Sequence, residues 1–162
     1  VRDLEHFTAQ GADEVEFMIS TNPGSIPPRP LGEVASGGEL SRIMLAIKAV
    51  LAETDDIPTL IFDEIDAGIS GRAAQMVSEK LHLIAGSHQV LCITHLPQIA
   101  AMADCHFEIV KEAKDGRTTT RIRPLDEEDS VRELARLLGG AQITDAVAEN
   151  AREMRRLAKR RG

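Results

Sequence analysis

The stretch “TLIFDEIDAG”, residues 59–68, carries the strongest indication of how this chain folds and where it binds a ligand. The short apolar run before Asp63 is typical of a strand buried on both faces of a parallel sheet. Asp63 and Glu64 follow at the carboxyl end of that strand, where open α/β sheets bind their ligands. Because side chains alternate along a strand, the two carboxylates point in different directions and can have different roles.

The segments on either side of this strand predict an α/β fold, with a partly parallel sheet flanked by helices. Upstream, a helix is predicted from about Ser36, because apolar residues recur there at helical spacing. They are Leu40, Ile43, Met44, Ile47, Val50 and Leu51. Downstream, the pattern predicts a helix over 71–86, a second buried strand over 89–94 and a short helix over 96–103.

The two ends of the chain are predicted to hold smaller elements. Residues 1–10 are expected to be the end of an arriving helix, with Leu4 and Phe7 as its apolar contacts. The other expected elements are a strand over 15–20, a proline-rich loop over 21–32, a β-hairpin over 106–125 that turns at Asp115–Gly116, and helices over 130–138 and 144–160.

Composition argues against several classes of function. The 162 residues carry a net charge of −7, which disfavours a chain that grips DNA over its whole surface. No apolar run approaches the length of a membrane span, so no membrane partner is expected. Cys92 and Cys105 lack CxxC spacing and are expected to be reduced, buried thiols of a cytoplasmic protein. A basic cluster near the C-terminus fits a solvated helix end better than a nucleic-acid contact. It comprises Arg152, Arg155, Arg156, Lys159, Arg160 and Arg161.

The segment Ser36-Gly37-Gly38-Glu39 begins the first predicted helix. Ser36 and Glu39 fit a capping box, in which each satisfies a free N–H group of the first turn. A cap does not explain the two glycines, since glycine within a helix is less stable than alanine by roughly 1 kcal/mol. A helix N-terminus also attracts anions, and bare backbone lets a phosphate approach its N–H groups. A cap alone and an anion site both remain open.

His95 follows the second predicted strand and so lies at the same sheet edge as the two carboxylates. Asp63 suits the binding of Mg²⁺ through water, and Glu64 suits positioning or deprotonating an attacking water. The plainer alternatives are that the strand ends in two solvated acids and that His95 is a structural hydrogen-bonding group. Zinc is not expected, because the other histidines show no metal-ligand spacing. They are His6, His82, His88 and His106.

In this order, the segments resemble the C-terminal part of an ABC-type ATPase head. Ser36–Glu39 matches the signature motif, “TLIFDE” the Walker B strand, “IDAG” the D-loop and His95 the switch histidine. Longer stretches narrow the resemblance to RecN, a bacterial family of SMC-like ATPases that repair DNA double-strand breaks. They are “VASGGELSRIMLAIKAVL”, with Ala35 before the signature serine, “IFDEIDAGISGRAA” and “ITHLPQIAAMAD”.

The resemblance implies a division of the chain and a set of missing parts. Residues 1–10 would be the stub of a returning coiled-coil helix, and 11–162 the C-terminal ABC-ATPase subdomain. A G-x-x-x-x-G-K-[ST] segment does not occur in these residues. The P-loop lobe and the coiled coil of the same protein are therefore expected as partners, together with DNA bound by the whole protein. A cytoplasmic, nucleoid-associated location is also implied.

The resemblance further implies roles for the site residues. Ser36–Glu39 would contact the γ-phosphate of an ATP held by a second head, so that two heads sandwich ATP as a homodimer. Glu64 would polarise the hydrolytic water, His95 would sense the γ-phosphate, and Asp66 would couple the two sites. Mg²⁺ would be held near Asp63 through water. ATP would drive dimerisation, and hydrolysis would release it.

Two other functions fit parts of the sequence. The chain could be a docking or dimerisation module of an SMC-like protein, without chemistry of its own. A metal-dependent nuclease built on Asp63, Glu64 and Asp66 would leave the glycine-rich helix start without a use. Indifference of association to ATP would indicate a docking module, and Mg²⁺-dependent DNA cleavage would indicate a nuclease.

Overall fold

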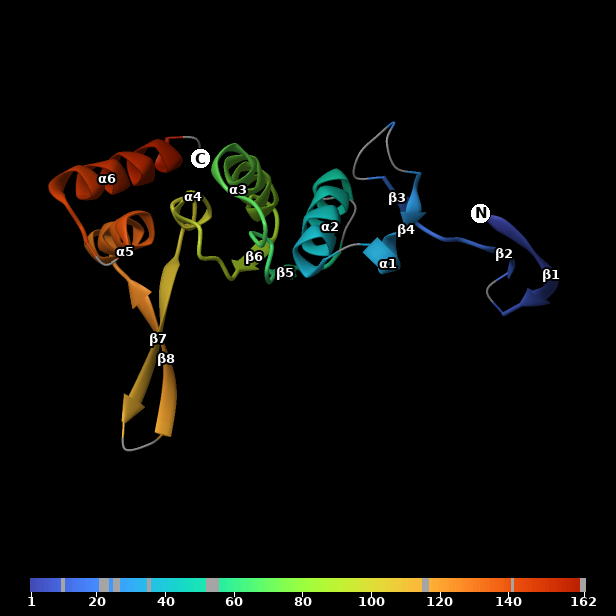
Figure 1. Ribbon diagram of the computed structural model, residues 1–162, viewed down its shortest axis with the longest axis horizontal. Helices are drawn as coiled ribbons and strands as arrows, with labels where there is room; N and C mark the ends of the chain where they lie inside the picture. Colours follow the sequence, from blue (N-terminus) through green and yellow to red (C-terminus); the bar gives the residue numbers. More distant parts are fainter. Residues whose placement is uncertain are drawn as a thin grey trace.

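The computed structural model describes residues 1–9, 11–20, 24, 27–34, 36–51, 56–114, 117–140 and 142–160. The fold is of the α/β kind, as the sequence predicts, with six helices and eight strands among these residues. Figure 1 shows an extended arrangement, with the N-terminal strands at one end and the last two helices at the other. Within the described part of the chain, no helix is long and apolar enough to cross a membrane.

The centre of the fold is a pair of parallel strands with helices beside it. Helix α2 (Gly37–Leu51) precedes strand β5 (Thr59–Phe62), and helix α3 (Gly71–Ala85) connects β5 to strand β6 (Gln89–Cys92). The two strands pair in parallel, with Phe62 opposite Cys92. Their carboxyl ends therefore lie at the same edge, so the loops that carry Asp63 and His95 begin side by side. This part of the sequence prediction is confirmed.

Two apolar clusters hold the helices in place, and the short helix α4 (Pro97–Ala100) contributes to both. The first cluster joins α2, β5, α3 and α4 through Leu45, Leu60, Phe62, Ile65, Leu81, Ile84 and Ile99. The second joins α4 to helices α5 (Glu127–Gly139) and α6 (Asp145–Lys159) through Ala100, Ala101, Leu134, Ala135 and Ala151. Because one short helix lies between the clusters, the sheet and the C-terminal helices form one packed unit.

The strand pair is covered on one face only, which differs from the expectation of burial on both faces. Leu60 and Phe62 are buried against the helices, whereas Ile61, Leu91 and Ile93 are exposed on the other face. The apolar stripe predicted for α2 is also largely exposed, because the helix packs through Gly38 and Leu45 instead. Its exposed members are Leu40, Met44, Ile47, Val50 and Leu51.

A β-hairpin follows α4 and projects away from the helices (Figure 1). Strands β7 (His106–Lys114) and β8 (Arg117–Leu125) pair in antiparallel register, with Ile109 opposite Ile122. The hairpin is therefore confirmed, although its predicted turn at Asp115–Gly116 lies outside the described residues. Both C-terminal helices are confirmed as well, with α5 beginning three residues earlier than predicted.

The N-terminal region differs from its prediction. Strands β1 (Arg2–Thr8) and β2 (Gly11–Glu14) pair with each other, so the helix expected over residues 1–10 is wrong. Leu4 and Phe7 are spaced as in a helix, but pairing with the following segment outweighs that weak local signal. Strand β3 (Met18–Ile19) pairs with β4 (Arg29–Pro30), and the one-turn helix α1 (Leu31–Val34) follows. Much of the predicted 21–32 loop lies outside the described residues.

Candidate functional site

The N-terminus of α2 forms the capping box that Ser36 and Glu39 predict. The backbone N–H of Ser36 donates to Glu39 Oε2 at 2.8 Å, and the N–H of Glu39 donates to Ser36 Oγ at 3.3 Å. The Ser36 hydroxyl also lies 3.1 Å from the same carboxylate oxygen. Hydrogen bonds from the backbone and side chain of Ser36 hold the pKa of Glu39 below its usual value. The cap therefore accounts for both residues within this chain.

The two glycines are explained by close packing against the loop that follows β5. A Cβ atom at Gly38 would lie 2.8 Å from the Glu64 carbonyl oxygen and 2.9 Å from the Ala67 Cβ atom. A Cβ atom at Gly37 would lie 2.6 Å from Glu64 Oε2. Since real Cβ atoms do not approach other atoms so closely, glycine is what allows α2 to meet this loop. The contact also places the Glu64 carboxylate over the first turn of α2.

Glu64 adopts an uncommon backbone conformation at this contact. Its φ angle is 56°, and it is the one non-glycine residue with a positive φ in the described part of the chain. Its N–H group donates to Asp63 Oδ1 at 2.9 Å, which ties the two acidic residues together. Left-handed backbone is unfavourable for residues with a Cβ atom and is concentrated at functional sites, so Glu64 is marked as unusual independently of its chemistry.

Two residues of α2 that sequence reasoning did not single out also hold this loop. Ser41 Oγ donates to the backbone oxygen of Asp63 at 2.9 Å. Arg42 Nη1 donates to the backbone oxygens of Ile65 and Ala67, at 3.1 and 2.8 Å. A signal for them was present, because helical periodicity puts both residues near the buried Gly38 and Leu45.

Asp66 lies beneath the loop that follows β6. Its side chain is only 4% exposed, and its Oδ2 atom accepts hydrogen bonds from Thr94 Oγ1 at 2.6 Å and from the His95 N–H at 2.8 Å. The same oxygen lies 3.0 Å from His95 Nδ1. Burial acts to raise the pKa of Asp66, but the hydrogen bonds from Thr94 and His95 outweigh it and lower the pKa. The predicted site residues therefore meet around one loop, residues 63–67.

The carboxylates suit only a partial magnesium site. Asp63 and Glu64 are exposed and adjacent, but the described residues contain no group of three or more potential metal ligands. Mg²⁺ is commonly held by one or two carboxylates together with waters and substrate phosphates. Asp63 fits that mode of binding, in which water and the phosphates of a ligand supply the remaining oxygens.

The cysteines differ from each other in exposure. Cys92 is partly buried at the end of β6, and burial, followed by the charges of Asp66 and Asp63, raises its pKa to about 12. Its thiol therefore stays protonated and unreactive near neutral pH. Cys105 is exposed, so its predicted burial is wrong.

The basic cluster at the C-terminus is mostly paired within the chain. Arg152 and Arg156 form ion pairs with glutamates one turn earlier on α6, and Lys159 pairs with Glu127. Arg155 departs from the expectation of a solvated helix end, because it is buried and donates to the backbone oxygens of Ala101 and Ala103. Arg161 lies outside the described residues.

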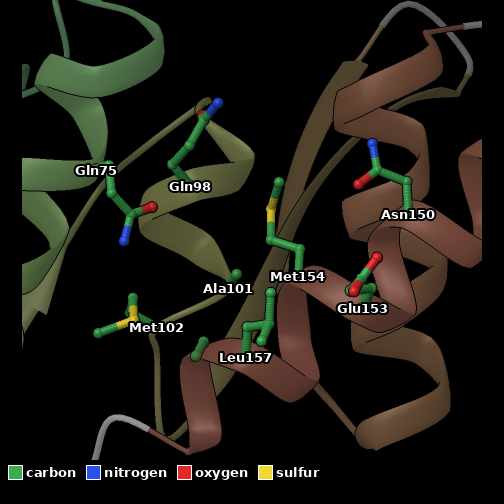
Figure 2. Close-up of a pocket in the computed structure, with 9 residues that line it drawn as sticks. Gln75, Gln98, Ala101, Met102, Asn150, Glu153, Met154 and Leu157 are labelled. Atoms are coloured by element: carbon green, nitrogen blue, oxygen red, sulfur yellow. The ribbon is translucent and has the colours of Figure 1, made fainter.

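A cavity of about 250 Å³ lies between α3, α4 and α6, away from this site (Figure 2). Its lining combines apolar side chains with amides, and none of the predicted site residues contributes to it. The lining residues are Gln75, Gln98, Ala101, Met102, Asn150, Glu153, Met154, Leu157 and Ala158. The site and the cavity are therefore separate features of the fold.

Fold and site together define a class of protein: an α/β chain whose polar site lies where a helix N-terminus meets the carboxyl edge of a parallel strand pair. In sequence the chain is similar to curated DNA repair proteins named RecN. The DNA repair protein RecN of Bacillus subtilis is 54% identical over 147 residues, 91% of this chain and 25% of the relative. RecN of Vibrio cholerae is 48% identical over 153 residues, 94% of this chain and 27% of the relative. The chain thus spans about a quarter of the length of these relatives.

A further RecN relative and one solved structure were also compared with the chain. RecN of Streptomyces coelicolor is 45% identical over 150 residues, 92% of this chain and 26% of the relative. A solved structure described as “Structural biochemistry of ATP-driven dimerization and DNA stimulated activation of SMC ATPases” is 24% identical, with a TM-score of 0.49. That alignment covers 77% of this chain and 81% of the solved chain, and agreement at this level decides nothing by itself. No family model matches the chain.

Proposed function

We propose that this chain is the C-terminal part of the ATP-hydrolysing head of a RecN-like DNA repair protein. Two heads would sandwich ATP between them, so that binding drives their dimerisation and hydrolysis releases it. The observation that carries the proposal is the meeting of the α2 N-terminus, the two carboxylates and His95 around loop 63–67. It occurs in a chain that resembles RecN over nine-tenths of its length.

The residues of loop 63–67 divide the proposed work between them. Glu64 acts as the base or orienting group for the attacking water, and Asp63 holds Mg²⁺ through water. The magnesium ion would supply charge neutralisation for the phosphates. Asp66 connects this loop to His95, and through this connection it couples the two sites of a dimer.

The start of α2 and His95 would contact the nucleotide. In the proposed sandwich, Ser36–Glu39 contacts the γ-phosphate of an ATP bound by the second head, and Gly37 and Gly38 contribute the backbone N–H groups, because those of Ser36 and Glu39 donate within the cap. The close packing of both glycines on loop 63–67 supports this role, because it couples the phosphate-facing helix to the carboxylates of its own chain. His95 faces solvent with 71% of its side chain exposed, which leaves it accessible to a phosphate.

The open face of the strand pair supports the view that the chain is one part of a larger head. Ile61 is 69% exposed and Leu91 is 47% exposed, and the two lie opposite each other in adjacent strands. A soluble protein rarely leaves a contiguous apolar face uncovered. We propose that the lobe bearing the P-loop covers this face.

The first test is ATP hydrolysis with and without the rest of the protein. The isolated chain should have negligible turnover, because it holds no P-loop, and adding the P-loop lobe should restore it. Equal turnover by the isolated chain and the complete head would contradict the assignment. Crosslinking with and without ATP separates the docking alternative, since association of a pure docking module is indifferent to nucleotide.

The second test is the substitution Glu64→Gln in the complete protein. Loss of a general base typically lowers turnover by about 10²- to 10⁴-fold, while ATP-driven association of the heads should persist. Glu128→Gln is a matched control, because Glu128 lies on α5 with a side chain that is 86% exposed. Unchanged turnover in Glu64→Gln would remove Glu64 from its proposed role.

A further inference from the structure

We propose that Asp66 is a positioning residue for His95: it binds the ring through Nδ1 and so presents Nε2 to the nucleotide site. This inference rests on the proposed function and deepens it, because it assigns Asp66 a task within its own chain. Asp66 lies on the loop after β5, whereas His95 lies 29 positions later on the loop after β6. The contact therefore joins the two loops that carry the proposed chemistry.

One carboxylate oxygen accepts a hydrogen bond from the backbone of the histidine and also lies close to its ring. Oδ2 accepts from the His95 N–H at 2.8 Å and lies 3.0 Å from the ring atom Nδ1. It also accepts from Thr94 Oγ1 at 2.6 Å, and that hydroxyl in turn accepts from the Leu96 N–H at 3.0 Å. The backbone of residues 94–96 is thus anchored on Asp66 immediately before α4 begins.

The contact with Nδ1 has a consequence that the backbone contacts do not have. An ionised carboxylate has no proton to donate, so its position 3.0 Å from Nδ1 favours the form of the neutral ring that carries its proton on Nδ1. Nε2 is then the ring atom that remains for a ligand, and none of the described residues bonds to it. Histidines at metal and catalytic sites are commonly fixed in this way by a carboxylate on the opposite nitrogen.

The difference in exposure between the two side chains supports a positioning role. The Asp66 side chain is 4% exposed and cannot reach a ligand itself, whereas the His95 side chain is 71% exposed. A ring so exposed would rotate freely about its side-chain bonds without a fixed partner. The buried carboxylate supplies that partner, and the Thr94 hydroxyl and the His95 N–H group hold the carboxylate in turn.

A double-mutant cycle in the complete protein tests whether Asp66 acts through His95. Asp66→Asn should lower kcat for ATP hydrolysis by about 10- to 100-fold, the usual effect of removing such a partner, with KM for ATP little changed. Added to His95→Ala, Asp66→Asn should produce no further loss, because the ring it positions is gone. The proposal is overturned if Asp66→Asn leaves kcat unchanged, or if it lowers kcat equally in both backgrounds.

Ring-nitrogen NMR of ¹⁵N-histidine-labelled protein provides a readout that does not depend on ATP. With the ring neutral, His95 should carry its proton on Nδ1, and Asp66→Asn should raise the share of the Nε2-protonated form. Thr94→Val removes the hydroxyl but keeps the Asp66 carboxylate and the His95 N–H group, so it should lower the melting temperature and change the ring protonation pattern less than Asp66→Asn does. An equal change in both variants, or in neither, would overturn the proposal.

The two measurements separate this inference from the proposed function. If His95→Ala leaves ATP turnover unchanged, the proposed role of His95 fails, whatever the ring protonation shows. If His95→Ala abolishes turnover but Asp66→Asn changes neither kcat nor the ring, the proposed function stands and the role of Asp66 fails. Thr94→Ser retains the hydroxyl and should match the wild-type protein in both measurements.

Discussion

At Gly38, the absence of one methyl group determines how closely helix α2 approaches loop 63–67. The neighbouring Gly37 shows that two adjacent glycines can have different constraints. The atoms nearest a Cβ at Gly38 are mainly backbone and cannot move independently, whereas the atom nearest a Cβ at Gly37 is the far end of the exposed Glu64 side chain. Position 38 is therefore fixed by packing, and position 37 affects mainly where the Glu64 carboxylate lies.

We expect Gly38→Ala to lower the free energy of unfolding by about 1–3 kcal/mol, as is usual when atoms are added to a tightly packed contact. Gly37→Ala is the matched control and should change stability by less than about 1 kcal/mol, because Glu64 can rotate away. Urea unfolding of both variants measures the difference. Equal stability of the two variants would show that the helix can shift without loss, contrary to this packing.

At the same scale, the sequence predicted which residues of the candidate site share one sheet edge but could not assign every contact among them. The spacing of Asp63, Glu64 and His95 relative to two strands was enough to place them at one edge. The burial of Asp66 was not predictable, because its two hydrogen-bond donors come from residues 28 and 29 positions away. Nor did the sequence distinguish anion binding from packing at Gly38, since both call for the absence of a side chain.

Among the elements, α4 has an importance that its length does not suggest. It contributes Ile99 to one apolar cluster and Ala100 to the other. Arg155 of α6 binds its C-terminal end, donating through Nη1 to the oxygens of Ala101 and Ala103 at 2.7 and 2.6 Å. Helix ends leave carbonyl groups without partners, and a buried guanidinium satisfies them here. This contact connects the C-terminal helices to the segment that follows His95.

We expect Arg155→Met to lower the free energy of unfolding by roughly 3 kcal/mol or more, because hydrogen bonds to charged groups contribute about 1.5–3 kcal/mol each. Arg152→Met is the control on the same helix: its ion pair with Glu149 is exposed and should contribute less than about 1 kcal/mol. Thermal or urea unfolding compares them. If Arg155→Met lowers the free energy of unfolding no more than Arg152→Met does, the buried contact does not contribute to stability.

The predictions of helices and strands were correct where the apolar pattern of the sequence was long, and wrong where it was short. The helices over 71–85 and 145–159 and the 106–125 hairpin have several periods each, so chance matches are few. The first ten residues offered only Leu4 and Phe7, and pairing between β1 and β2 decided their conformation. For α2 the element was right but its buried face was not, because Gly38 packs more closely than any apolar side chain would allow.

For the molecule as a whole, the uncovered face of the strand pair is the feature that most needs a partner. Alternate residues of β5 are buried, while Ile61 between them is exposed together with Leu91 and Ile93. The apolar stripe of α2 is a second exposed apolar surface. In the proposed head, these residues would become interior on assembly with the P-loop lobe.

We expect Ile61→Glu to leave the melting temperature of the isolated chain nearly unchanged, because the side chain is already 69% exposed. The same substitution should prevent assembly with the P-loop lobe, since it would bury a charge without a partner. Leu83→Glu on the outer side of α3, where Leu83 is 62% exposed, is the control and should assemble normally. Size-exclusion chromatography of the mixed parts measures assembly; normal assembly by Ile61→Glu would rule out this face as the contact.

At Glu64, which has a positive φ angle, the stability of the fold and the proposed catalytic role favour different residues. A left-handed residue with a Cβ atom raises the energy of the folded chain by about 1–2 kcal/mol, and glycine would remove that strain. Laboratory evolution that rewarded heat resistance alone would therefore move away from glutamate at this position. Selection for nucleotide turnover, in which Glu64 has its proposed role, would instead retain glutamate.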